Sequence, residues 1–144
     1  MIGFAASVIA GAVMSLQGVL NTALSGKIGL YESNTFVQGT AFVFSIIAMI
    51  FFGKGSFSPL KEINFIYLTG GFLGVIITIT VMLGISKLNP TTAISVILVS
   101  QLVCAALIDA FGLFGSEKIS FNLKNYIGIA LMISGIIVFK LANR

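Results

Sequence analysis

Five apolar segments dominate the sequence, each close to the length that a helix needs to cross a membrane. A transmembrane helix needs roughly 17–25 mostly apolar residues to cross about 30 Å of hydrocarbon. Short polar breaks such as "SGKIG", "GKGSFSPLKE" and "GSEKISFNLK" separate the segments. We expect spans at approximately 2–24, 33–52, 63–85, 91–113 and 125–141. The breaks are too short to form a second domain, so residues 1–144 are expected to be one membrane domain.

The composition favours a membrane protein over a soluble one. Hydrophobic residues make up 58% of the chain and charged residues only 8%, whereas a soluble domain carries about 25% charged residues. Too few polar side chains are present to cover a globule. We therefore expect an all-α integral membrane protein that crosses the cell (plasma or inner) membrane several times.

Several functional classes lack the residues that they require. The chain has no histidine and one cysteine, Cys104, so neither the usual zinc ligands nor a Ser-His or Cys-His catalytic pair is available. The eight Lys and Arg residues are scattered and form no basic stripe for nucleic acid. The sequence contains no Gly-x-x-x-x-Gly-Lys-[Ser/Thr] loop for ATP. We expect no enzyme activity, no metal, no cofactor and no nucleic-acid partner.

The basic residues are balanced between the two sides of the membrane. Five spans put the termini on opposite sides, and each side then carries four Lys or Arg residues. On the N-terminal side, called side A, these are Lys54, Lys61, Lys118 and Lys124, and on side B they are Lys27, Lys87, Lys140 and Arg144. Orientation follows the Lys/Arg bias of short loops, so a bias of zero favours insertion in both directions over one direction set by a subtler signal. Two opposite copies can pair around an axis in the membrane plane, as transporter repeats do, which predicts an antiparallel homodimer in lipid.

Large amides recur within the apolar segments at similar depths. With a rise of 1.5 Å per residue, Gln17 lies about 22 Å from side A, and Gln38 about 8 Å inside side B, at nearly the same level. Asn21 shares a helical face with Gln17, because residues four apart are neighbours. Gln101 lies about 15 Å along its segment, near the midplane. Since polar groups facing lipid are costly, these amides are predicted to bind a solute in a polar cavity; hydrogen bonding between helices is the alternative.

Asp109 and a set of glycines complete the candidate residues. Asp109 lies roughly 27 Å along the fourth segment, close to side A. It is either an interfacial charge or a carboxylate at the cavity rim that couples an ion, because charges within membranes are usually functional. Small residues at helical spacing let helices approach closely. The glycines expected to form packing surfaces are Gly70, Gly71, Gly74, Gly128 and Gly135.

Four stretches follow one another over nearly the whole chain: "MSLQGVLNTALSGKIG", "GGFLGVIITI", "SQLVCAALIDAFGLFG" and "NYIGIALMISGIIVF". Together they resemble the YdcZ-like family (domain-of-unknown-function family 606) of the drug/metabolite transporter superfamily. The resemblance assigns Gln17 and Asn21 to a motif in the first span, and Gln101, Asp109 and Gly112 to a motif in the fourth. It implies a ten-helix transporter fold assembled as an antiparallel homodimer of dual-topology chains. Gln38 belongs to neither motif.

These observations predict membrane transport of a small polar or aromatic organic solute by alternating access. Amides donate and accept hydrogen bonds without the cost of a buried charge, and Phe36 or Phe42 can contact an aromatic part of the solute. Three alternatives stay open: a small multidrug-type exporter, a channel, and a structural membrane subunit without transport of its own. The small multidrug transporters differ from this sequence in having four helices and a membrane-embedded glutamate in the first.

Overall fold

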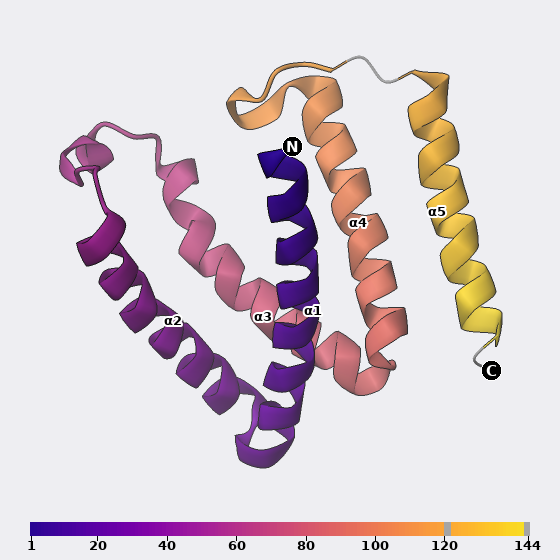
Figure 1. Ribbon diagram of the computed structural model, residues 1–144, viewed down its shortest axis with the longest axis horizontal. Coiled ribbons are helices and arrows are strands. Elements are labelled where there is room, and N and C mark those ends of the chain that lie inside the picture. Colours follow the sequence, from indigo (N-terminus) through magenta and orange to yellow (C-terminus); the bar gives the residue numbers. More distant parts are fainter. Residues whose placement is uncertain (120–121, 143–144) are drawn as a thin grey trace. The chain divides into compact units, whose positions relative to one another are not determined.

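The structure is a computed structural model that describes residues 1–119 and 122–142 (Figure 1). The described residues form five α-helices, joined by turns and short 3-10 segments, and contain no strand. The helices are α1 (Ile2–Ile28), α2 (Leu30–Phe52), α3 (Gly70–Lys87), α4 (Pro90–Phe111) and α5 (Leu123–Ala142). The predicted all-α fold is confirmed over this part of the chain. Arg144, which entered the predicted charge balance, lies outside the described residues.

Four of the described segments are long and apolar enough to cross a membrane. They are Ile2–Ile28, Leu30–Phe52, Phe65–Lys87 and Pro90–Phe111. The third begins with the 3-10 segment Phe65–Thr69, which leads directly into α3. The fifth, Leu123–Phe139, is apolar but shorter. The chain is therefore a multi-pass membrane protein, while the fifth span stays a prediction.

The chain divides into two compact units, Met1–Lys87 and Leu88–Arg144. In the first unit α1 packs against α2 and α3, and α2 also contacts α3. In the second unit α4 packs against α5. Consecutive helices within each unit run in opposite directions (Figure 1).

The turn between α1 and α2 is shorter than the predicted boundaries imply. The polar letters from "SGKIG" to "YESN" predict a break, yet α1 continues to Ile28 and α2 begins at Leu30, with Gly29 alone between them. Gly29 has a φ of 103°, a backbone conformation that glycine adopts without a Cβ clash. Its N–H donates to the Ser25 carbonyl at 3.0 Å. Glu32 lies in the first turn of α2, where the helix dipole favours a negative charge.

The two ends of α4 are set by local residues. The Asn89 side chain accepts a 2.8 Å hydrogen bond from the Thr92 N–H, and Pro90 begins the helix, as "SKLNP" predicts. The helix ends at Phe111 rather than near residue 113, because Gly112 takes the left-handed conformation with a φ of 63°. Glycine commonly ends helices in this way.

Gly29→Ala tests the one-residue turn. The added Cβ would meet the Glu32 carboxylate on a backbone of positive φ, and a non-glycine residue in this glycine-only conformation costs about 1–3 kcal/mol. We expect the free energy of unfolding to fall by about that amount, measured by circular dichroism during SDS titration of the purified protein.

Gly26→Ala is the matched control for this substitution. Gly26 lies in α1, and its added Cβ would meet no described atom within 4 Å. This variant should be as stable as the parent or more stable by up to about 1 kcal/mol, because alanine favours helix over glycine. Equal stability of the two variants would show that the turn does not require glycine.

Candidate functional site

A side-chain hydrogen bond joins α2 to α3. Gln38 Nε2 donates to Thr78 Oγ1 at 3.2 Å, and Thr78 Oγ1 donates to the backbone oxygen of Gly74 at 2.9 Å. Both side chains are half-buried. Gly74 lies beside the amide, since an added Cβ would be 3.7 Å from Gln38 Nε2. The predicted site residue Gln38 is thus positioned by α3, and bonding between helices is at least part of its role.

A second polar contact lies nearer to the α1–α2 turn and involves all three helices of the first unit. Ser33 is fully buried on α2 and donates to the backbone oxygen of Asn21 on α1 at 3.3 Å. Its hydroxyl also lies 3.7 Å from the sulfur of Met82 on α3. The Asn21 side chain is half-buried. Asn21 therefore contacts α2 through its backbone oxygen.

Asn34 is a candidate that the sequence prediction missed. Its side chain is 7% exposed, and its Oδ1 has no hydrogen-bond partner among the described residues. Leaving a buried polar group unpaired costs roughly 1–3 kcal/mol. Asn34 lies four residues before Gln38, so the two amides share one face of α2. Asn34 lies inside the predicted span 33–52, and its spacing of four from Gln38 is the signal that identifies it.

Gly18 sets the close approach of α1 to α3. It is buried, and an added Cβ would lie 2.9 Å from Ile85 Cδ1 and 3.1 Å from Val81 Cγ1. Gln17 precedes it, and successive residues of a helix point about 100° apart, which leaves Gln17 exposed. The sequence prediction missed Gly18, although its spacing of four from Thr22 is the small-residue pattern of packed membrane helices.

The structure does not gather all the predicted amides into one site. Gln17 on α1 and Gln101 on α4 are both exposed. Neither side-chain amide has a hydrogen-bond partner among the described residues. They belong to different units of the chain. Within the first unit, Gln38 and Asn21 each contact a neighbouring helix. The binding roles of these four residues stay predictions.

Most of the predicted packing glycines lie open on the single chain. An added Cβ at Gly70, Gly71, Gly128 or Gly135 would meet no described atom within 4 Å. Gly74 alone of this set lies against another helix in the described structure. Close packing at the other four positions remains a prediction, and it would have to involve atoms outside the described residues of this chain.

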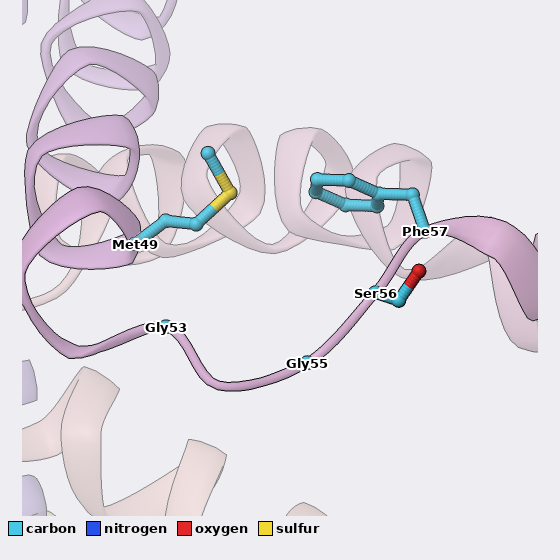
Figure 2. A pocket seen from close by; sticks show the side chains of 5 residues that line it. All are labelled: Met49, Gly53, Gly55, Ser56 and Phe57. Carbon is cyan, nitrogen blue, oxygen red and sulfur yellow. The ribbon is translucent and has the colours of Figure 1, made fainter.

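Two surface cavities contain contrasting residues. One follows α2, has a volume of about 360 Å³ and is lined by Met49, Gly53, Gly55, Ser56 and Phe57. Figure 2 shows the Met49 and Phe57 side chains on the same side of this loop. It contains one hydroxyl and no charge, and none of the predicted site residues lines it. The other, here called the α4–α5 cleft, measures about 340 Å³ and contains Asp109, Lys124 and Asn125.

The fold and the polar contacts define the class: a helical multi-pass membrane protein whose apolar spanning helices carry polar side chains near their middles. Residues 2–138 match the family model described as "Putative inner membrane exporter, YdcZ", and the chain belongs to this family. The family resemblance is confirmed, and with it membrane transport and an inner-membrane location at the family level. No curated protein and no solved structure matches the chain.

Asn34→Leu and Gln38→Leu separate an unpaired amide from a paired one. Asn34→Leu removes a buried acceptor that has no partner, so the free energy of unfolding should rise by about 1 kcal/mol. Gln38→Leu removes the bond to Thr78 and should lower that free energy by about 0.6 kcal/mol, the average for such bonds between membrane helices. SDS titration measures both changes. A clear loss of stability in Asn34→Leu would show that Oδ1 has a structural partner.

Proposed function

We propose that the chain transports a small polar or aromatic organic solute by alternating access, as an antiparallel homodimer of dual-topology protomers. One observation carries this proposal: Gln17 and Gln101 are exposed although they lie near the middles of apolar helices. They are about 22 Å and 17 Å from the starts of α1 and α4 by helix rise. An amide facing hydrocarbon is costly, so protein or water has to cover both.

A second copy in the opposite orientation supplies this cover. The four basic residues on each side leave no bias for one direction of insertion. A two-fold axis in the membrane plane brings a mid-helix residue of one copy to the depth of the same residue in the other. The exposed amides of both copies then repeat in mirror positions about the midplane and together outline one polar layer around it, and five spans from each copy make a ten-helix bundle.

The polar layer holds the solute, and each side of the membrane reaches it in turn. Gln17, Asn21 and Gln101 line the cavity, and the α2 face with Asn34 and Gln38 adds to it. The unpaired Oδ1 of Asn34 supports this extension, because a solute donor would remove its cost. Rocking of one copy against the other around a fixed midplane site accounts for alternating access.

The residues of the layer select a neutral or weakly charged solute. The four carboxylates lie away from the helix middles: Glu32 in the first turn of α2, Asp109 in the last turn of α4, and Glu62 and Glu117 in connecting segments. A lipophilic cation would favour an acidic centre, whereas amides suit solutes that donate and accept hydrogen bonds.

An aromatic part of the solute has surfaces to contact on α2. Phe36 and Phe42 are 59% and 67% exposed. Phe36 also lines a surface cavity of about 330 Å³ together with Gly39 and Thr40. Aromatic rings gain from stacking beyond the area that they bury. These phenylalanines therefore support the aromatic variant of the proposed solute.

Gln101→Leu tests the solute site. Leucine has nearly the same volume, so the variant should insert and dimerise, while saturable uptake into proteoliposomes falls about tenfold for the loss of a solute hydrogen bond. The uptake is measured with a panel of neutral polar and aromatic metabolites. Val103 is an exposed residue of the same helix, α4. Val103→Leu is therefore the control and should transport normally.

Other results of this experiment identify the alternatives. Normal uptake by Gln101→Leu with a weakened dimer would mean that the amide bonds helices together. Single-channel currents in place of saturable uptake would identify a channel. Absence of any flux by the parent protein across the panel would favour a structural subunit, and uptake of lipophilic cations alone would favour a small multidrug-type exporter.

Added loop charge tests dual topology. Gly55→Lys with Ser56→Lys puts two basic residues into the α2–α3 connection on side A, and should convert a C-terminal topology reporter from labelling at both faces to labelling at one. Transport should fall with it and return when an oppositely biased copy is co-expressed. Gly55→Asp with Ser56→Asp is the control, because acidic residues contribute little to orientation. Labelling of the parent from one face only would contradict dual topology.

A further inference from the structure

We propose that the α4–α5 cleft binds a phospholipid whose headgroup carries a primary amine, of the phosphatidylethanolamine type. This lipid site is argued from the α4–α5 cleft alone and does not depend on the proposed solute. The cleft lies within the second unit, between two helices that pack against each other. Asp109 from α4 and Lys124 and Asn125 from α5 line one end of it. This end, the mouth, carries one negative and one positive group, as a zwitterionic headgroup does.

Both charges oppose the dipoles of the helices that carry them. Asp109 lies in the last turn of α4 and Lys124 in the first turn of α5. A helix favours cations near its C-terminus and anions near its N-terminus, so each charge is at the unfavourable end. Within the described chain no ion pair joins the two side chains. Neither charge stabilises its own helix, and both remain available to a ligand.

The helix ends favour the same orientation of the headgroup. α4 ends and α5 begins at the mouth, which brings the negative end of the α4 dipole and the positive end of the α5 dipole to the same end of the helix pair. Some of these terminal groups are bonded within the chain, because Ile119 N–H donates to the Asp109 carbonyl and Asn125 N–H donates to Asn122. An ammonium group is favoured beside the Asp109 carboxylate and the negative end of the α4 dipole. A phosphate is favoured beside Lys124 and the α5 N-terminus. The two side chains and the two helix ends therefore favour the same orientation of a zwitterionic headgroup in the cleft.

The carboxylate selects among headgroups. A primary ammonium has three N–H donors for Asp109, as the lysine ammonium does. A trimethylammonium headgroup has no N–H donor, and an anionic headgroup without an amine leaves Asp109 facing a like charge. The phosphoethanolamine type is thus the headgroup whose two ends both find a partner.

The inner part of the cleft has the polarity of the acyl region. Leu102 and Met132 lie seven and eight residues from the charges on their helices, or about 10–12 Å deeper by helix rise. Ala105, Ala106 and Gly128 lie between. An added Cβ at Gly128 would meet no described atom within 4 Å, so the groove is open. A charged mouth above an apolar groove suits a lipid rather than a freely soluble zwitterion.

Tryptophan fluorescence reports on this cleft directly, because the chain contains no tryptophan. Met132→Trp places a reporter at the inner end of the cleft, and Leu131→Trp places the matched control on the same helix but outside the lining. Each full-length variant is reconstituted in phosphatidylcholine vesicles with a small fraction of acyl-brominated phosphatidylethanolamine, phosphatidylcholine or phosphatidylglycerol. Bromine quenches a tryptophan that it contacts, so quenching measures relative lipid affinity.

We expect brominated phosphatidylethanolamine to quench Met132→Trp selectively, and the three lipids to quench Leu131→Trp equally. Adding Asp109→Asn or Lys124→Gln should lower the relative affinity about tenfold, the loss of one charge-assisted contact, and Asp109→Glu should restore much of it. Size-exclusion chromatography and circular dichroism check that each variant is folded. Equal quenching by all lipids, selectivity that survives both charge changes, or protection of Met132→Trp from every lipid by a second protein copy would each overturn the proposal.

Discussion

A polar group at membrane depth needs a partner other than lipid, and this requirement organises the structure. Serine and threonine meet it within their own helix: Ser7, Thr22 and Ser45 donate to the carbonyl four residues earlier at 2.7–2.9 Å. Amides carry two donors and an acceptor, more than one turn of helix can satisfy. The amides consequently reach another helix, as Gln38 does, or need a partner from outside the chain.

Much of the fold follows from the apolar runs, because spanning length and cap residues act locally. The Asn89 cap and Pro90 were predictable in this way, but the turn at Gly29 was not. α1 has 27 residues, about 40 Å by helix rise, which exceeds about 30 Å of hydrocarbon. Its last turns therefore extend into the interface, where Ser25 and Lys27 are polar yet helical. Polarity marks the edge of the membrane, and a helix need not end there.

The sequence predicts the depth of the candidate residues in the membrane, but it does not predict the side of the helix bundle that each side chain faces. Sequence spacing put Gln17 and Gln38 at one level, whereas the face that each presents depends on tertiary packing. Gly18 against Ile85 turns Gln17 outward, and Asn34, which lies inside the predicted second span, is a candidate because it is buried with an unpaired Oδ1. Lys124, counted from the sequence as a loop charge, shares a cleft with Asp109 because α5 packs on α4.

We propose that an amide exposed on the single chain faces a hydrated cavity in the assembled protein. The most direct test of this proposal is the reaction of Gln101→Cys with a membrane-impermeant thiol reagent in proteoliposomes, in a Cys104→Ala background that removes the natural cysteine. Val103→Cys, exposed on the opposite face of α4 at nearly the same depth, is the reference. We expect rapid labelling of Gln101→Cys, slowed by transported solute, and slow labelling of Val103→Cys. Equally slow labelling of both variants would contradict the proposal.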